Sequence, residues 1–364
     1  MNKSICFSSN EDTVKTAFRD YMGHYMTEVA KRKGYIYDNT VSFAEKEVKI
    51  NKLMMDEITR MSGLSFSNGM ASPEMISNNP NLRWAAFAVV NSLIDMIVPE
   101  VLDKSIGIYT EQRVGAYGDN FSFTVEPNDL FYVSKVGHDQ RTTEFQKQFV
   151  GQTTIIPETR ALTVSVNFYK VLCRKESLAK FVMKAILSLE AQITKEVYVA
   201  FDTAMNEIPT SPTAEALHLT GWSADSAVRV AQTVSAFNNG ADPIFIGTKL
   251  ALNKAIPSNA NYRYDIESDF VRVGFLRNFM GYDALEMKQV ADWKKKKLVL
   301  NDKRIYVVSP AYGKIVKLCY EGGSRTINRD FEDAADMEAS TTIFKSYGIG
   351  IATNAIAGVI DLQQ

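Results

Sequence analysis

The side chains that could perform acid–base or metal chemistry are few and widely spaced. The 364 residues include three histidines and three cysteines, namely His24, His138, His218, Cys6, Cys173 and Cys319. No histidine lies in a recognisable motif, and the cysteines form no C-x-x-C pair. The spacing therefore predicts neither a zinc site nor a disulfide framework. We expect ordinary surface or loop histidines.

Carboxylates gather in residues 265–269 and 332–338. Paired carboxylates can hydrolyse glycosides or bind a cation. Here they lie among small polar residues and lack the turn glycine that a calcium loop needs, which favours solvated turns.

Two glycine-rich stretches could bind phosphate or another anion. Residues 348–350 come nearest to a dinucleotide turn, but the third glycine is displaced, so a glycine-kinked strand is favoured. The loop at residues 322–324 could hold an anion beside Arg325. Glu321 would repel that anion, which favours a simple loop tip. The sequence thus predicts a protein that is not an enzyme, with no catalytic residue, no cofactor and no metal.

The composition limits the partners. Hydrophobic residues make up 46% and charged residues 23%, so the chain can bury a core. The net charge is −1, which gives no overall positive field for nucleic acid. The basic run at residues 294–297 is interpreted as a solvated hairpin flank.

The most apolar window, residues 84–98, is too short to span a bilayer, and the beginning of the chain lacks a signal-peptide core. We therefore expect a soluble intracellular product without membrane contact.

Helical periodicity predicts the elements that must position these residues. Apolar residues recur every three or four positions from residue 176 to 206, which indicates one helix of roughly 45 Å. Two shorter helices are expected before residue 63, and a loop over residues 62–81. A further helix is predicted for residues 82–96, with Pro99 setting its end.

From residue 106 to 173 the apolar period changes to two, which predicts short β-hairpins. The expected strands are at residues 121–125, 131–133 and 162–168. A ribbon of this kind has poorly protected edges in water, so it packs on its own molecule or across a neighbour. After Pro212, expected helices at 224–237, 248–255 and 269–279 alternate with strands at 243–247, 284–287, 297–300 and 304–308, which suggests a small α/β domain. Residues 343–361 are strand-like, with breaks at Gly348, Gly350 and Gly358.

This order of elements, with two blocks of residues, resembles the major capsid proteins of tailed bacteriophages, which share the Hong Kong 97-type fold. The first block runs from Asn91 through Pro99 to Phe123 and is similar to the family's lead-in to an extended hairpin. The second, Val171 to Leu178, is similar to the base of that hairpin joined to the spine helix. Residues 245–248 and 274–287 resemble the axial domain. The resemblance covers most of the chain from Leu82 onward.

The resemblance implies an α+β fold and an order of segments along the chain. These are an N-terminal arm or helical region (1–81), a lead-in helix and linker (82–108), an extended β-hairpin (109–172), a peripheral domain with the spine helix (173–222), a compact α/β axial domain (223–329) and return strands of the peripheral domain (330–364). It also implies assembly with copies of itself, through hexamers and pentamers, into an icosahedral shell around double-stranded DNA, which is held without sequence specificity. Portal, scaffolding and decoration proteins are the further implied partners. The implied location is the virion, after synthesis in the host bacterial cytoplasm.

The resemblance also directs attention to the ribbon as a contact between subunits. We expect residues 111–160 to reach over an adjacent subunit and the compact lobe to meet its copies at a ring centre. The candidate interface residues are Glu111, Arg113, Phe131, Phe145, Phe149, Arg160, Arg174 and Glu176. Three alternatives stay open: an encapsulin-like cellular compartment of the same fold, another virion or tail component, and an α/β enzyme that acts on a small molecule.

Overall fold

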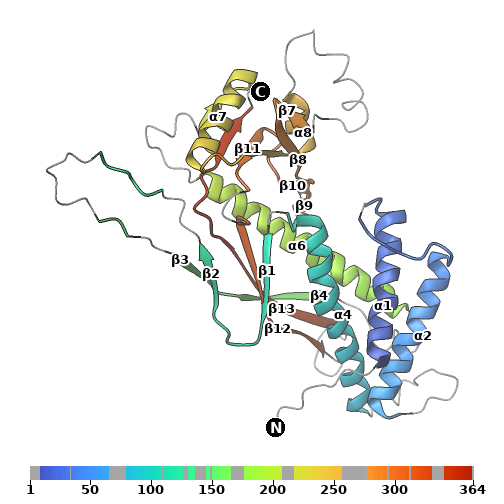
Figure 1. Cartoon of the computed structure of the whole chain (residues 1–364). Coiled ribbons are helices and arrows are strands. Elements are labelled where there is room, and N and C mark those ends of the chain that lie inside the picture. Colours follow the sequence, from blue (N-terminus) through green and yellow to red (C-terminus); the bar gives the residue numbers. More distant parts are fainter. Residues whose placement is uncertain are drawn as a thin grey trace.

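The computed structural model describes residues 9–32, 34–64, 79–108, 110–125, 130–135, 145–147, 150–164, 176–206, 217–255, 275, 277–292, 295–310, 313–329 and 340–362. Within these residues a long helix, α6, lies at the centre of the molecule, and a compact lobe with α7 and α8 lies at one end (Figure 1). A helical region with α1 and α2 lies on one side, and a ribbon that begins at β2 and β3 projects on the side opposite to it (Figure 1). The ribbon therefore stands away from the main hydrophobic core.

The N-terminal helices form where the two short apolar stripes predict them. Helix α1 (Ser9–His24) continues into one π-helical turn, η1 (Tyr25–Val29), and α2 (Phe43–Ser62) follows. Ser42 and Glu45 form a capping box at the start of α2, and Gly63 ends it with a φ of 69°. Phe18 of α1 and Ile58 of α2 are fully buried. Most of the predicted loop, residues 65–78, lies outside the described residues.

Helix α4 (Pro80–Ile106) is longer than the sequence predicts, because it continues through Pro99. A proline removes one backbone hydrogen bond, but α4 packs against α1, α2, α6 and β12, and this burial maintains the helix. By length and composition α4 could cross a membrane, contrary to the expectation that this segment is too short. Here its apolar side chains, such as Val90 and Ile94, lie in the main core instead.

The long predicted helix is confirmed as α6 (Leu178–Asn206), whose apolar face packs on α4 and on strand β13. A residue of α2 caps its N-terminus. The Asn51 side chain donates to Ser177 Oγ and accepts the Ala179 N–H, both at 2.9 Å. The spine helix and the N-terminal region are therefore joined by hydrogen bonds as well as by packing.

Four strands form a sheet in the order β1-β12-β13-β4: β1 (Thr110–Gly115), β12 (Val316–Arg329), β13 (Ser340–Ile351) and β4 (Glu158–Val164). Strand β1 is parallel to β12, and the other pairs are antiparallel. Gly348 and Gly350 do not break β13 as predicted, because both keep their partners on β12. A Cβ at Gly350 would lie 2.7 Å from the Ile155 side chain, so glycine allows the ribbon base to approach the sheet.

The compact lobe contains a six-stranded sheet in the order β5-β14-β11-β6-β8-β7. Its strands are β5 (His218–Thr220), β14 (Gly358–Asp361), β11 (Arg304–Val308), β6 (Ile244–Gly247), β8 (Tyr282–Glu286) and β7 (Asn278–Phe279). Helices α7 (Ala224–Phe237) and α8 (Lys249–Lys254) pack on it, as predicted. The helix expected at 269–279 is wrong at its end, since residues 278–279 are a strand; residues 269–274 and 276 lie outside the described part. A small hairpin, β9 (Ala291–Asp292) with β10 (Lys297–Leu298), carries the exposed residues of the basic run.

Strand pairing crosses the predicted segment boundaries at two places. Strand β12, within the range predicted to be axial (223–329), joins the sheet of β1 and β13. Strands β5 and β14, from the two ranges predicted to be peripheral, join the sheet of the compact lobe. Sheet membership depends on partners far apart in the chain, which residue periodicity does not identify.

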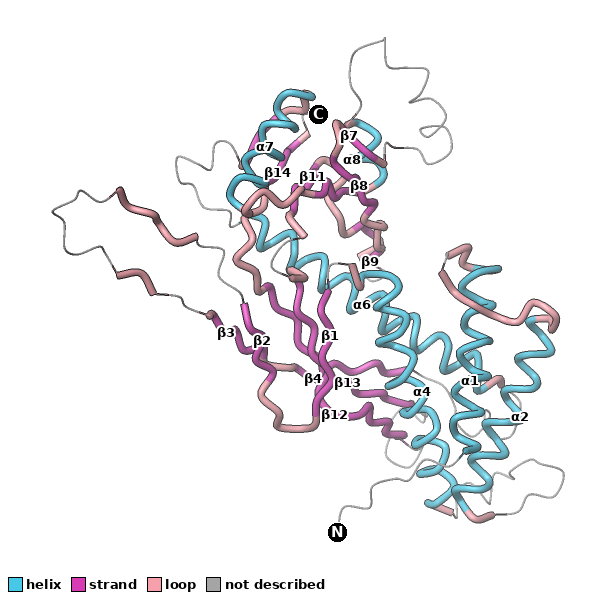
Figure 2. The backbone as a smooth tube through the Cα atoms, viewed as in Figure 1, coloured by secondary structure: helices cyan, strands magenta, loops and turns pink. Residues whose placement is uncertain are grey.

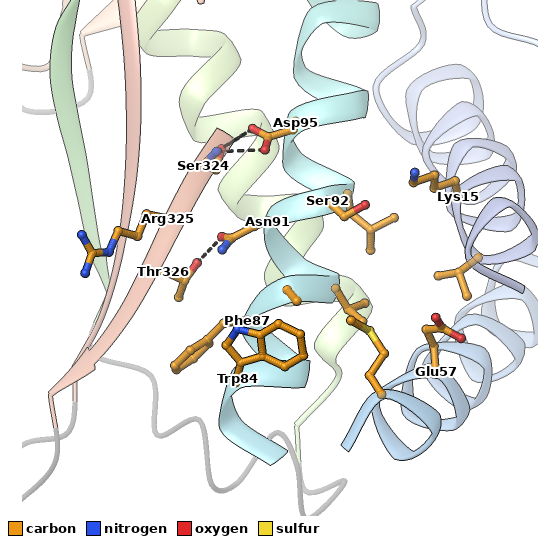
Figure 3. Close-up of a pocket in the computed structure, with 15 residues that line it drawn as sticks. Lys15, Glu57, Trp84, Phe87, Asn91, Ser92, Asp95, Ser324, Arg325 and Thr326 are labelled. Carbon is orange, nitrogen blue, oxygen red and sulfur yellow. Dashed lines mark hydrogen bonds between the residues drawn. The ribbon is translucent and has the colours of Figure 1, made fainter. Parts of the chain in front are cut away.

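A polar face of α4 holds β12 and β13. Asp95 accepts the Ser324 N–H at 2.8 Å and the Ser324 hydroxyl at 2.5 Å, and it forms an ion pair with Lys345, which is 3% exposed. Beside it, Asn91 Oδ1 accepts the Thr326 hydroxyl at 2.6 Å (Figure 3). The glycine-rich loop at 322–324 is thus a bulge within β12 that binds the protein's own carboxylate, not a loop tip.

Replacement of Asp95 by alanine should destabilise the subunit by about 3 kcal/mol, because it leaves the Lys345 ammonium buried without its carboxylate. Urea unfolding of the unassembled subunit at neutral pH measures this loss. The matched control is Asp103→Ala, an exposed position on the same helix, which should change stability by less than about 0.5 kcal/mol. Equal losses in the two variants would contradict the role given to the ion pair.

Candidate subunit interface on the extended ribbon

The ribbon has a buried base. Strands β2 (Phe121–Val125) and β3 (Gly151–Ile155) pair antiparallel along their whole length. Phe121, Phe123 and Ile155 form a small cluster with Cys319 of β12, separate from the main core. Beyond this base the ribbon has two arms, one after β2 (residues 130–135) and one before β3 (residues 145–147), and both project away from the body (Figure 2). The cluster anchors the ribbon, while the described residues of its distal part (130–135 and 145–147) belong to no hydrophobic core.

The distal part is bridged by a side chain. Gln146 Nε2 donates to the Tyr132 carbonyl and Gln146 Oε1 accepts the Tyr132 N–H, both at 2.6 Å. The predicted strand at residues 131–133 is wrong, since these residues are not in a strand. The Gln146 amide takes the place of a backbone partner and keeps the two arms together.

Five large apolar or aromatic side chains of the distal ribbon are exposed, and they are Leu130, Phe131, Tyr132, Val133 and Phe145. Phe145 is 99% exposed and Val133 90%. Single exposed apolar residues are ordinary, but a contiguous apolar patch typically marks an interaction site. The two aromatic candidates Phe131 and Phe145 are thus both exposed, one on each side of the distal ribbon.

The charged candidates at the base bind within the chain. Lys317 Nζ of β12 lies 2.7 Å from Glu111 Oε2, and Arg113 donates to Glu111 Oε1 at 3.2 Å. Arg113 also donates to the Ser122 carbonyl at 2.7 Å and lies over the Phe123 ring. Burial raises the pKa of Glu111, but Lys317 and Arg113 outweigh it and hold that pKa below its ordinary value. These contacts tie β1 to β2 and β12.

The other candidates are not brought together. Arg160 of β4 forms ion pairs with Glu158 at 2.7 Å and with Glu196 of α6 at 3.3 Å. Glu176 is exposed just before α6. Phe149 and Arg174 lie outside the described residues. Arg160 thus joins β4 to the spine helix, and an interface role for it stays a prediction.

Sequence reasoning missed Gln146 and Lys317. Val316, Leu318 and Tyr320 recur at every second position around Lys317, although Lys317 and Cys319 are buried too. That period of two could have identified β12 as a strand. Gln146 gives no comparable signal, because its role depends on the approach of the opposite arm.

A second uncovered apolar surface lies on the body. A groove of about 450 Å³ runs beside α4, between α1, α2 and the bulge of β12. Trp84, which is 57% exposed, and Phe87 line it (Figure 3). Apolar surface is thus uncovered both on the ribbon and on the body.

A network of polar side chains positions the compact lobe on α6. Arg304 of β11 donates to Asp361 of β14 at 2.6 Å and to Asp202 of α6 at 3.2 Å. Tyr306 donates to the same Asp202 at 2.5 Å, and His218 lies 2.7 Å from Asp361. Burial raises the pKa of Asp361, but hydrogen bonds from Arg304 and His218 outweigh this and lower it. This network fixes the lobe relative to the spine.

The described residues do not form a metal centre: within them no group of three or more histidine, cysteine or acidic side chains lies close enough to hold an ion. His24 packs against the Tyr37 and Phe43 rings, and Cys319 is buried at the ribbon base. His138, Cys6, Cys173 and the carboxylates of 265–269 and 332–338 lie outside the described residues.

Replacement of Glu111 by glutamine should lower the stability of the subunit by about 1 kcal/mol at pH 7. The folded-state pKa is depressed, so the contribution is present above the ordinary carboxyl pKa and is lost as the pH falls through the folded value. The difference between wild type and variant should therefore shrink as the pH falls below the ordinary carboxyl pKa of about 4.3. Urea unfolding over this pH range measures it, with exposed Glu176→Gln as the control; a pH-independent difference would contradict the ion pair.

Comparison with known proteins bears on the fold. No family model and no curated protein matches the chain. Among solved structures, the capsid of a native GTA particle is 12% identical, covers 71% of this chain and 90% of that chain, and has a TM-score of 0.50. The mature capsid of bacteriophage PhiM1 is 9% identical, covers 70% and 86%, and has a TM-score of 0.48. The cyanophage P-SCSP1u capsid is 11% identical, covers 71% and 87%, and has a TM-score of 0.44.

These identities are low, so the comparison concerns the fold alone. It rests on the GTA capsid, which has the TM-score of 0.50. The matched part includes nearly the whole of that capsid subunit. The chain has the Hong Kong 97-type capsid fold that its sequence resemblance implies.

Proposed function

We propose that this chain is the major capsid protein of a tailed bacteriophage, and that it assembles through hexamers and pentamers into an icosahedral shell enclosing double-stranded DNA. One observation carries the proposal: the distal ribbon exposes Phe131, Val133 and Phe145 to solvent on a chain with a capsid fold. In a lone subunit this apolar surface is exposed to water, which costs free energy. A neighbouring copy can cover it.

A contact of this kind joins two different surfaces of the subunit. The ribbon projects on one side of the subunit, and the helical region lies on the other (Figure 1). A contact between two different surfaces of the same chain repeats from copy to copy and closes into a ring when the rotation permits. In this proposal the ribbon reaches over an adjacent subunit and the compact lobe lies at the ring centre.

The remaining partners follow from the same proposal. A net charge of −1 suits a container that encloses DNA without binding a particular sequence. Portal and scaffolding proteins, and decoration proteins on the outer surface, complete the proposed set. The finished protein resides in the virion after synthesis in the bacterial cytoplasm. It acts by packing and not by catalysis; the acidic side chains Glu111, Asp95 and Asp361 serve ion pairs within the subunit.

Electron microscopy separates this function from the alternatives. An encapsulin-like compartment would give closed shells loaded with protein cargo, without a portal or DNA. Another virion or tail component would give tubes or rings. An enzyme of the compact lobe would remain small and convert a metabolite at a concave site with converging polar groups.

Replacement of Phe145 by aspartate should abolish shell formation, because it places a charge where the proposal requires burial. Phe145→Leu keeps an apolar side chain at the same position and should assemble. Sedimentation velocity and micrographs distinguish subunits from shells, and circular dichroism checks the fold. Normal shells from the aspartate variant would exclude Phe145 from the interface.

A shortened ribbon tests the proposal without a change of charge. Val125 and Gly151 are paired across β2 and β3, so a two-residue Asn-Gly turn can replace residues 126–150 and keep the base. The variant should be a folded, soluble subunit that forms no closed shells. Closed particles of normal size would contradict the role proposed for the distal ribbon.

A further inference from the structure

A cavity of about 470 Å³ lies at the junction of the N-terminal region, the spine helix and the compact lobe. Its walls come from the segment after η1, the last turn of α4, one face of α6 and the residues before β9. A volume of this size is typical of small-molecule sites. Nothing in the proposed shell function uses this cavity.

The polar lining of the cavity is cationic. Arg32, Lys104 and Lys288 contribute three positive charges, and Glu190 of α6 contributes one negative charge. The Glu190 carboxylate is bound by Arg32, with 2.5 Å between Oε1 and Nη1. Lys104 lies 4.3 Å from the centre of the Tyr35 ring. Among the described residues neither lysine forms a salt bridge, so two positive charges in the lining are not balanced.

Apolar side chains supply the rest of the lining. Leu187, Ala191 and Val290 form apolar walls of the cavity. Thr194, one turn after Glu190 on α6, is 6% exposed, and its Oγ1 is buried without a hydrogen-bond partner in the described part of the chain. Because that oxygen has almost no accessible surface, a molecule in the cavity would not reach the hydroxyl.

We propose that this cavity binds a small monocarboxylate with an apolar chain. The two lysines attract the acid group, and the apolar walls contact the chain. Because the lining comes from segments before residue 36, within α4 and α6, and after residue 287, the bound molecule would tie these parts of the subunit together.

Decanoate is a suitable probe, and decan-1-ol is its uncharged counterpart. Isothermal titration of the full-length protein should show saturable binding of decanoate, at least about tenfold tighter than that of the alcohol. The double variant Lys104→Gln/Lys288→Gln should lose at least about tenfold in decanoate affinity. The matched control Lys249→Gln/Lys303→Gln replaces two exposed lysines elsewhere and should bind as wild type does.

Replacement of Thr194 by valine is a second control, because the Thr194 hydroxyl does not reach the cavity. Without decanoate the variant should melt at or above the wild-type temperature, because it removes an unsatisfied polar group. Its decanoate affinity should equal that of the wild type. Lack of saturable decanoate binding by the wild type, equal binding of the alcohol, or unchanged affinity in the lysine variant would each overturn the proposal. These outcomes do not depend on whether the protein forms shells.

Discussion

The apolar face of helix α6 is the surface on which the other parts of the molecule are arranged. Helices α2 and α4, strand β13 and the β9 hairpin all contact it. A helix of this length gains most of its stability from such burial and not from intrinsic propensity. Both of its ends are also bound by distant side chains: Asn51 at the beginning and Arg304, through Asp202, near the end. The helix thus links the compact lobe to the sheet from which the ribbon projects.

Buried polar pairs determine how the parts meet. Asp95 with Lys345, and Glu190 with Arg32, join segments that are far apart in the chain. A buried pair contributes little net stability, since desolvation opposes the attraction, but loss of one partner is costly. The main effect of these pairs is therefore to disfavour other arrangements of α4, β13 and the N-terminal segment. The groups that could bind a substrate or an ion are largely used in this way, and the loop at 322–324 binds Asp95.

The ribbon differs between its base, where side chains are paired or buried, and its tip, where large apolar side chains are exposed. At the base, Glu111 and Arg113 have partners and Phe123 is buried. At the tip, Phe131 and Phe145 are exposed. The base thus fixes the direction in which the ribbon projects, while the tip has little reason to be stable in water by itself. An element that is rigidly placed and incompletely covered is suited to meet another surface, and this contrast supports the proposed shell function.

The sequence by itself determined the elements whose signal is local. The apolar stripes of α2, α6 and α7, and the stop after Phe237, follow from residues within a few turns of one another. It also determined that the ribbon must find cover. The tertiary structure alone decided that α4 continues through Pro99, that β12 lies beside β1, and that Lys317 binds Glu111. These outcomes depend on burial and pairing between residues as much as 206 positions apart, and such contacts leave no periodic pattern in the chain.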